Sequence, residues 1–485
     1  MDTFDSTTTS DHADAQALPF TEDVFHPSIP AELQIQIFSF ACTDSNTDVT
    51  DILRFASVCR SWRHVIYSTP QFWTRLRLDW KQYCKGARVS YGETPPISEW
   101  IERAGLHALA IDIRGVDSER NMEHRSEDKA VTYLRNPLLF PMHRLRELSI
   151  SLNVIQRLPD SIMYSQKTLF PLLEVLRLDE PIRASVIWDW IYSRRTRVRA
   201  VTTFYNCPLL HTLALDVAPA EMADGLQHRV SLPWKSLKRV ELCVERHEIA
   251  RTTLELCTSV THLKLRLSEP RTNPHPDSDQ PPLYTFSTIQ TLILEVDRAF
   301  PADFLRDVAM PNLTSFTLTD VVNWNLKRSE TEHNALTKFI ARAPLITRFA
   351  LRQSGFENEA GLYALQRLPL LEEVALEWRV AECPSWRITD ELRHSEGCPY
   401  LRRIDFLGIQ PMNKKLNREP SLFLAGLPAL VQARLALVMW QRMVRLQHVE
   451  VCVRDCRVED VKEMEWCKEL MALADDRLCI DVVRS

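Results

Sequence analysis

The side chains that could do chemistry in this chain stand apart from one another. Cys452 and Cys456 are separated by three residues, and the second pair of ligands that a zinc site usually has is missing. A His-Glu pair at 247–248 and a Glu-His pair at 123–124 have no partner at metal-ligand spacing. The sequence contains no GxSxG, no HExxH and no CxxC. We therefore expect no catalytic residue, no metal and no cofactor, so that the protein is not an enzyme.

Phosphate-binding loops are also missing from the sequence. Such loops need glycine, because the backbone must come close to the nucleotide. The chain has 10 glycines in 485 residues, where average usage is about 7%, and it contains neither GxGxxG nor GxxxxGK[ST]. The net charge of −5 is small for this length and argues against binding nucleic acid through bulk charge. We expect neither a nucleotide-dependent enzyme nor a nucleic-acid partner.

Two polar segments could instead bind a partner. The segment 192–200, YSRRTRVRA, carries four arginines that could hold an acidic or phosphorylated motif through charge-assisted hydrogen bonds. The segment 268–282, SEPRTNPHPDSDQPP, predicts an exposed loop because it is rich in proline and polar residues. A solvated helix face for the first and a tolerated insertion for the second are the competing interpretations.

Composition predicts a chain with a large core and no membrane segment. Hydrophobic residues make up 45% of the sequence and charged residues 25%, as in globular domains. No run of about 18 apolar residues occurs, and the first 20 residues lack the features of a signal peptide. The 12 cysteines are scattered, mostly in apolar stretches, which predicts reduced, buried thiols in the cytosol or nucleus.

Three short helices are predicted after the polar N-terminal tail. IPAELQIQIFSFA, which begins at Ile29, has helical apolar spacing, and Pro30 suits a first helical turn. A polar loop at 42–48 leads to DILRFASVCRSWRHVIY, and Pro70 then precedes Phe72 and Trp73. So short a segment buries too little surface to be very stable alone, and its surplus of large apolar side chains favours packing against another protein. The alternative is a small helical subdomain and nothing more.

A second pattern recurs beyond residue 100, with an aliphatic residue or Phe at positions i, i+3 and i+5. It predicts strands that alternate inward apolar and outward polar side chains, and the intervening segments 333–343 and 360–368 have helical spacing. The leucines should form the core of a stacked solenoid. The twelve units begin at Leu106, Leu145, Leu173, Leu210, Leu237, Val260, Ile289, Leu313, Ile346, Leu371, Leu401 and Leu446.

Proline before the units separates this pattern from chance. Six units have proline two residues before their start, where about one such coincidence is expected from 28 prolines. Proline there should end the preceding helix and set the next residues extended, before a strand. The six are Pro171, Pro208, Pro311, Pro344, Pro369 and Pro399. At the C-terminus, 458–476 predicts one amphipathic helix and 478–483 a last strand, which together would seal the end of the solenoid.

The N-terminal helices resemble the F-box family. The family pattern opens with Pro, an acidic residue and Leu, continues through Ile-Phe and a Leu-rich helix to Val-Cys-Arg-x-Trp-Arg, and ends in Pro-x-x-Trp. Ile29 stands where the opening Leu is usual. The matching residues are Pro30, Glu32, Leu33, Ile37, Phe38, Leu53, Val58, Cys59, Arg60, Trp62, Arg63, Pro70 and Trp73.

The later units resemble leucine-rich repeats, whose length is about 20–29 residues. The consensus Asn or Cys that forms a ladder between repeats is nearly absent, with Asn153 as the one match. The predicted fold class is therefore α/β, with a small N-terminal three-helix F-box followed by an irregular leucine-rich-repeat solenoid. The chain looks similar to divergent proteins of this kind in mushroom-forming fungi. Expected boundaries are a disordered tail at 1–25, the F-box at 26–80, a connector and leading helix at 81–105, and the solenoid with its C-terminal cap at 106–485.

The resemblance implies a substrate-recognition adaptor of an SCF-type (Skp–cullin–F-box) ubiquitin ligase. The F-box would bind a Skp-type adaptor, which joins a cullin and a RING subunit, and the repeats would bind an unknown protein substrate. Residues that match the adaptor-facing motif are Pro30, Leu33, Ile37, Phe38, Leu53, Val58, Cys59, Trp62, Ile66 and Trp73. Candidate substrate-binding residues at outward strand positions are Arg146, Glu147, Arg239, His262, Glu372, Glu373, Arg402 and Arg403.

Two rival classes of function remain open. The chain could be a protein-interaction scaffold whose F-box engages the adaptor without degradation. It could also be a small-molecule sensor, as some F-box solenoids are, which would need a basic concave pocket. Lys and Arg are spread evenly across the repeats, which disfavours the sensor.

Overall fold

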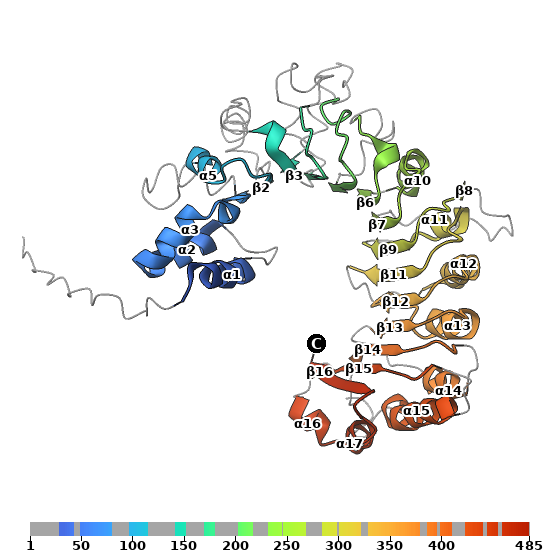
Figure 1. The fold of residues 1–485 in the computed structure, drawn as a ribbon. Coiled ribbons are helices and arrows are strands. Elements are labelled where there is room, and N and C mark those ends of the chain that lie inside the picture. Colours follow the sequence, from blue (N-terminus) through green and yellow to red (C-terminus); the bar gives the residue numbers. More distant parts are fainter. Residues whose placement is uncertain are drawn as a thin grey trace, which may run out of the picture. The chain divides into compact units, whose positions relative to one another are not determined.

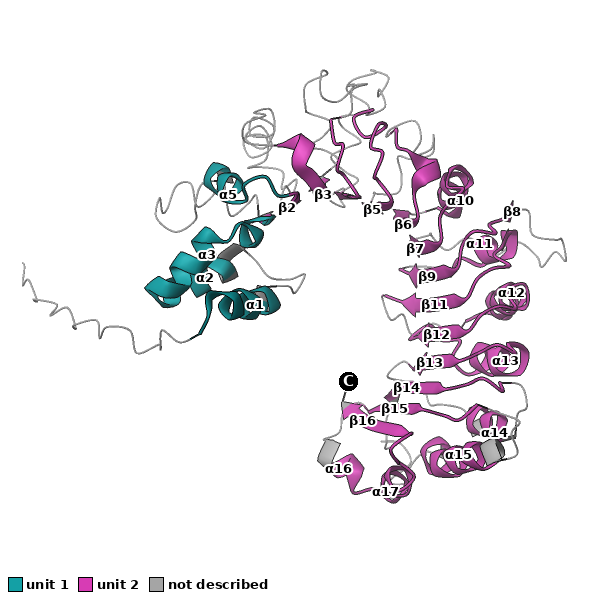
Figure 2. Ribbon diagram, viewed as in Figure 1, with its two compact units in different colours: residues 1–76, 92–107 teal, residues 77–91, 108–485 magenta. Residues whose placement is uncertain are grey.

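The chain divides into two compact units in a computed structural model (Figure 2). Unit 1 comprises residues 1–76 and 92–107, and unit 2 comprises residues 77–91 and 108–485. The predicted tail, the arginine-rich segment and the proline-rich loop lie outside the described residues. The described residues are 29–42, 49–79, 97–114, 141–151, 169–179, 202–216, 231–244, 246–267, 284–297, 300–321, 328–378, 386–394, 398–409, 422–439, 444–453 and 458–484.

Unit 1 contains the three predicted helices, followed by a single 3₁₀ turn and a further helix. They are α1 (Ala31–Cys42), α2 (Val49–Val58), α3 (Arg60–Ser68), η1 (Pro70–Trp73) and α5 (Ile97–Arg103). Proline begins η1, where its fixed φ suits a first turn. The residue after α5, Ala104, is followed by Gly105 with a φ of 59°, a conformation that glycine adopts without strain and that ends the helix.

Aromatic side chains form the core of unit 1. Phe38 on α1 is buried against Trp62 on α3 and Phe72 in η1, with ring centroids 4.8 and 6.2 Å away in edge-to-face geometry. Trp73 is fully buried, packs edge-to-face on Trp100 of α5 at 4.6 Å, and donates its Nε1–H to a main-chain carbonyl of α3 at 2.9 Å. Two tryptophans therefore join α5 to the first three helices.

Unit 2 is built on a 14-stranded sheet in which the strands follow one another almost in chain order (Figure 1). All twelve predicted units carry a strand, the predicted last strand is β16, and the pairs from β2 to β16 are parallel. The strands are β1 (Arg75–Asp79), β2 (Leu109–Arg114), β3 (Leu145–Ser151), β4 (Val175–Asp179), β5 (Thr212–Asp216), β6 (Arg239–Val244), β7 (His262–Leu267), β9 (Thr291–Val296), β11 (Ser315–Asp320), β12 (Arg348–Arg352), β13 (Glu373–Glu377), β14 (Arg403–Ile409), β15 (His448–Val453) and β16 (Cys479–Arg484). β8 (Tyr284–Thr285) and β10 (Val308–Ala309) form a separate parallel pair.

Helices lie along one side of the strands from β6 to β15 (Figure 1). They are α10 (His247–Leu256), α11 (Ala302–Asp307), α12 (Glu330–Ala341), α13 (Glu359–Arg367), α14 (Trp386–His394) and α15 (Leu422–Met439). Apolar strand residues at the same register stack into continuous core rows, such as Leu292, Phe316, Phe349 and Val374, and all four are buried. None of the helices in the described ranges is long and apolar enough to cross a membrane.

Two local predictions are wrong. Leu106 is 95% exposed, whereas the first residues of the other eleven units are buried. The strand of this unit begins only at Leu109, so Leu106 still belongs to the turn after α5.

The predicted helix 458–476 is two helices, α16 (Val458–Lys462) and α17 (Glu465–Met471), because Met464 between them has extended backbone with φ −71° and ψ 141°.

The six prolines have a different role from the predicted one. Each occupies the second position of a β-turn, in which the first core residue of the unit donates its N–H to the carbonyl three residues earlier. Leu210 donates to Cys207 at 3.1 Å around Pro208, and Leu313 donates to Met310 at 3.1 Å around Pro311. Proline favours this turn position because its φ is already near −65°. The prolines therefore turn the chain into each strand rather than extend it.

A backbone ladder joins the repeats in the absence of an asparagine ladder. In each unit from Leu173 onward, the residue after the first core position donates its N–H to the carbonyl of the equivalent residue in the preceding unit, at 2.7–3.2 Å. That carbonyl also accepts the next N–H, as when Thr314 accepts from both Thr347 and Arg348. The ladder residues are Arg146, Glu174, His211, Lys238, Thr261, Gln290, Thr314, Thr347, Glu372, Arg402 and Gln447. The hydroxyls of Thr261, Thr314 and Thr347 also donate to the ladder carbonyls. The other ladder contacts join main-chain atoms, so that the side chain at this position can vary.

Most described cysteines are core residues, in agreement with the apolar surroundings of the sequence. Five of the eight described cysteines are buried. Burial raises the pKa of Cys207, Cys257 and Cys398 to about 12. Each therefore stays a thiol at neutral pH and packs as a small apolar group.

One ion pair is buried inside the solenoid. Asp320 takes the last inward position of β11, in register with Val296 of β9. Its Oδ2 accepts from Nη2 of Arg328 at 2.8 Å, and the two side chains are 3% and 7% exposed. Arg328 also donates its Nε–H to the carbonyl of Ser354 at 2.9 Å and lies over the ring of Phe356. This pair connects β11 to the turn after β12.

Asp320→Ala should lower the free energy of unfolding by about 3–5 kcal/mol, because the buried guanidinium of Arg328 loses its nearer carboxylate, while Glu332 lies 3.8 Å away. Chemical denaturation of the full chain, followed by circular dichroism, measures the change. Lys264→Ala is the matched control, since it removes an ion pair with Glu295 that is partly exposed and should cost at most about 1 kcal/mol. Equal effects of the two substitutions would contradict a structural role for the buried pair.

Candidate functional site

α1 carries apolar side chains on two sides. One side contributes Phe38 to the core. The other side, together with the residue before the helix, exposes a row at spacings of four, four and three residues, which places its members on one face. We call this row the α1 stripe: Ile29, Leu33, Ile37 and Phe40, which are 47%, 48%, 54% and 88% exposed. A further apolar side chain, Val58, is exposed at the end of α2.

The Val-Cys-Arg-x-Trp-Arg motif shapes the turn between α2 and α3. Cys59 has extended backbone and caps α3, because its Sγ accepts the N–H of Trp62 at 3.4 Å. Arg63 donates its Nε–H to the carbonyl of Ala56 near the end of α2, at 3.0 Å. The motif thus fixes the angle between the two helices and leaves Val58 at the surface.

The structure divides the predicted adaptor-binding residues into three groups. Pro30, Leu33, Ile37 and Val58 are exposed, whereas Leu53, Cys59 and Trp62 are partly exposed. The remaining three, Phe38, Ile66 and Trp73, are buried. Those three hold the helices together and cannot offer their side chains to a partner while this packing lasts. That the exposed ones contact an adaptor stays a prediction.

Sequence reasoning missed two members of the stripe, Ile29 and Phe40, as adaptor-binding residues. Phe40 lies three residues after Ile37 and is the most exposed of the four. The signal was present as the continuation of the spacing from Leu33 to Ile37 by one further turn. Covering half-exposed side chains of this size is worth about 1–2 kcal/mol each, because roughly half of each is already hidden. The stripe can therefore supply useful binding energy to a protein partner.

The predicted substrate-binding residues occupy two rows on unit 2. Arg146, Glu372 and Arg402 belong to the backbone ladder. The others take the first outward position of their strands, where Arg239 pairs in register with His262. Similarly, Glu147 lies on β3, and Glu373 pairs in register with Arg403. The structure thus brings the predicted residues onto two adjacent rows, although they come from separated groups of strands.

Three of these charged residues, Arg146, Arg239 and Arg403, already have an ion-pair partner within the described part of the solenoid. Arg146 pairs with Glu174 at 2.9 Å, and Arg239 lies 3.5 Å from Glu241. Because these pairs are exposed, each is weak and can exchange for a partner's charge at little cost. The charged side chains of the two rows can therefore take part in binding a partner, but the arrangement of their charges does not indicate a particular ligand.

A row of apolar side chains at the strand-entering turns escaped the sequence reasoning. Each member follows the turn proline directly and is 37–47% exposed. Three of them lie in the turns that lead into β12, β13 and β14, which are neighbours in the sheet. The row consists of Leu172, Leu209, Leu345, Leu370 and Tyr400. The signal was the repeated Pro-Leu or Pro-Tyr pair before the unit.

Comparison with known proteins identifies the N-terminal segment. Residues 26–79 match the model of the F-box-like family. The chain is similar to a protein from Bacteroides fragilis of known crystal structure, at 12% identity, with 67% of this chain and 68% of that chain covered and a TM-score of 0.29. It is also similar to the leucine-rich repeat-containing protein LegL7 from Legionella pneumophila, at 12% identity, with 64% of this chain and 94% of that chain covered and a TM-score of 0.32. No curated protein matches the chain.

TM-scores this low carry no argument about the fold. The assignment of unit 2 as a leucine-rich-repeat type of solenoid rests on its parallel register, its recurring strand and helix units and its buried apolar rows. Membership of the fungal sets of such proteins stays a prediction.

Trp73→Ala should destabilise unit 1 by about 3–5 kcal/mol, because a fully buried ring is lost from the aromatic core. Leu33→Asp, at a half-exposed position of α1, should cost only about 1 kcal/mol. Hydrogen exchange of peptides from α3 in the full chain measures both, with unit 2 peptides as the internal control. Rapid exchange in the Leu33→Asp variant would show that the α1 stripe has a structural role.

Proposed function

We propose that this F-box protein with a leucine-rich-repeat solenoid is the substrate-recognition adaptor of an SCF-type ubiquitin ligase. Unit 1 would bind a Skp-type adaptor, which connects to a cullin, and unit 2 would bind the target protein. The ligase would then act on the target in the cytosol or the nucleus, where the reduced cysteines of the chain are stable.

The observation that carries this proposal is the α1 stripe within the segment that matches the F-box-like family. The α1 stripe is apolar although the helical core does not use it, and Leu33 and Ile37 expose about half of their surface. Two apolar faces on one short helix fit an element that packs on its own domain with one face and on a partner with the other.

The proposed contribution to ubiquitination is positional. Catalysis would come from holding the target near a ubiquitin-conjugating enzyme, with the bond-forming groups supplied by other subunits. The solenoid suits this role, because its stacked backbone ladder fixes the strands while the outward side chains vary. We infer accordingly that the chain itself is not an enzyme.

Replacing Leu33 and Ile37 together by Asp should weaken co-purification with a Skp-type adaptor at least about tenfold. The substitution removes apolar burial and places two carboxylates in the interface, and each 1.4 kcal/mol is about a factor of ten. The measurement is quantitative pull-down or calorimetry with the full chain.

The matched control for this variant is Ala31→Asp. It places the same carboxylate on α1 about 120° around the helix from Ile37, in a first turn that favours negative charge. Adaptor binding should stay at the wild-type level. Absence of binding by the wild-type chain, or equal weakening by the control, would refute the F-box proposal.

Degradation distinguishes a ligase adaptor from a scaffold. Proteins that the full chain captures when the proteasome is inhibited should live longer in cells that express only the Leu33→Asp, Ile37→Asp variant. A chase after cycloheximide addition measures their lifetimes, with Ala31→Asp as the control. Captured proteins with unchanged lifetimes would favour the non-degradative scaffold.

A further inference from the structure

Three neighbouring strands bring ionisable side chains together at the C-terminal end of the sheet. In the first outward row Arg403, His448 and Cys479 are in register on β14, β15 and β16. In the second row Asp405 and Glu450 are in register and continue to Asp481. The chain segments that carry these groups are far apart in sequence, so strand pairing alone assembles the cluster.

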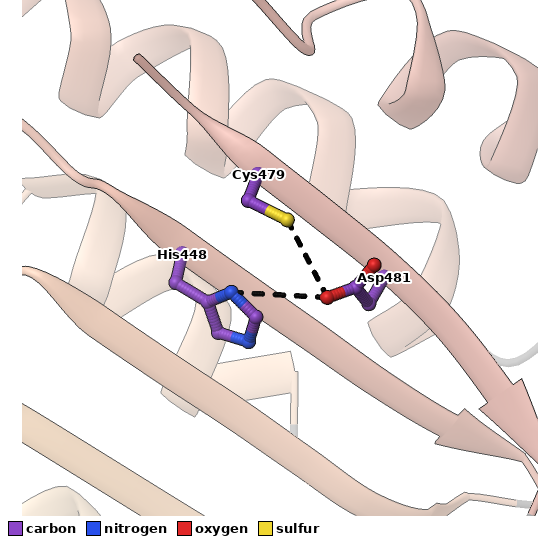
Figure 3. Close-up of side chains that lie close together, drawn as sticks. All are labelled: His448, Cys479 and Asp481. Atoms are coloured by element: carbon purple, nitrogen blue, oxygen red, sulfur yellow. Dashed lines mark hydrogen bonds and ion pairs between the residues drawn. The ribbon is translucent and has the colours of Figure 1, made fainter. Parts of the chain in front are cut away.

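Three of these side chains converge on one point. The Cys479 thiol donates to Oδ2 of Asp481 at 3.4 Å, and Nδ1 of His448 lies 3.9 Å from the same oxygen (Figure 3). The ligand atoms of His448, Cys479 and Asp481 all lie within 4.8 Å of one another. Cys479 and Asp481 are exposed, so that an ion can reach them from solvent.

These distances suit a tetrahedral zinc ion. Zinc binds imidazole nitrogen and carboxylate oxygen at about 2.0–2.2 Å and thiolate sulfur at about 2.3 Å, so that ligand atoms in a tetrahedron lie roughly 3.3–3.7 Å apart. The Sγ–Oδ2 and Nδ1–Oδ2 separations, 3.4 and 3.9 Å, are already near that range. Small rotations of the side chains complete the geometry without any shift of the strands.

The opposite edge of the imidazole faces two carboxylates. Nε2 of His448 lies 3.7 Å from Oε2 of Glu450 and 3.9 Å from Oδ1 of Asp405, and it has no hydrogen bond within the part of the chain that the structure describes. Carboxylates in this place favour the proton on Nε2, which leaves the Nδ1 lone pair for a metal. Histidine ligands of zinc commonly have such an outer carboxylate.

Arg403 keeps those two carboxylates out of the ligand set. Its Nε lies 2.9 Å from both oxygens of Asp405, and its Nη2 lies 3.2 Å from Oε2 of Glu450. With three carboxylates and one guanidinium, the cluster remains negative when His448 is neutral. The net charge attracts a divalent cation, while the thiol selects zinc over magnesium and calcium, which prefer oxygen ligands.

We propose that Nδ1 of His448, Sγ of Cys479 and the carboxylate of Asp481 bind Zn²⁺, with a water at the fourth position. The thiol proton that Asp481 accepts is released to solvent as the metal–sulfur bond forms. The ion joins β15 to β16, which is the edge strand of the sheet. It is a structural clamp on the end of the solenoid and is independent of the proposed adaptor role.

Titration of the full, reduced chain with Co²⁺ alone tests the site, because cobalt replaces zinc and its bond to a thiolate gives a near-ultraviolet charge-transfer band. We expect this band in the wild type and its displacement by Zn²⁺. Cys479→Ser should abolish it, and Glu450→Gln should weaken zinc affinity about 10–100-fold by disturbing the outer carboxylates.

Cys243→Ser is the matched control. Cys243 is also a partly exposed strand cysteine beside a carboxylate, Asp216, but it belongs to neither ion-binding cluster in the described residues. The band should persist in this variant. In addition, Zn²⁺ should slow hydrogen exchange of β16 in the wild type and not in Cys479→Ser.

Three results would overturn the proposal. One is the absence of a thiolate band in the wild type, and another is a band that survives Cys479→Ser. The third is zinc binding that resists Cys479→Ser and is lost only in Asp405→Asn or Glu450→Gln, since this would place the ion on the other edge of the imidazole.

Discussion

The backbone ladder between repeats is the interaction on which unit 2 depends. Nine carbonyls in the ladder, from Glu174 to Arg402, accept two N–H groups from the next repeat, as Thr314 does from Thr347 and Arg348. The contact starts every parallel strand pair in the same register, and this register stacks the inward leucines into continuous rows. A conserved asparagine is therefore not needed to hold the repeats together. Mainly main-chain atoms hold the repeats together, and in six units a proline turn leads the chain into the strand.

This use of the backbone separates stability from recognition. Inward side chains have little freedom, since each must fill the space between its neighbours in the preceding and following repeats. Outward side chains do not fill this space, so that charged residues can occupy their positions without loss of core packing. The cluster around His448 is one result of that freedom, and the exchangeable ion pairs near Arg239 are another. Asp320 is the exception, because it places a charge in the inward row and needs the buried Arg328 to compensate it.

Unit 1 meets the opposite constraint. It is too small to hide all of its large apolar residues, and its aromatic core uses only one side of α1. The residues that define the Val-Cys-Arg-x-Trp-Arg motif mostly hold helices in place, through the Cys59 cap and the Arg63 hydrogen bond. The α1 stripe stays at the surface because the core has no room for it. The motif that identifies the domain thus mainly reflects how its helices pack.

The sequence by itself determined where the helical unit and the strands lie, because helical spacing, strand alternation and proline turns depend on residues only a few positions apart. It also identified the twelve strands and the family of the N-terminal segment. Only the tertiary structure decided which motif residues are buried, since Phe38 and Ile37 are adjacent in sequence and face opposite environments. The interruption of the last predicted helix at Met464 and the position of His448 beside Cys479 are also visible only in the tertiary structure. Those outcomes depend on strand register and on the space left by distant side chains, and no local pattern of residues carries that information.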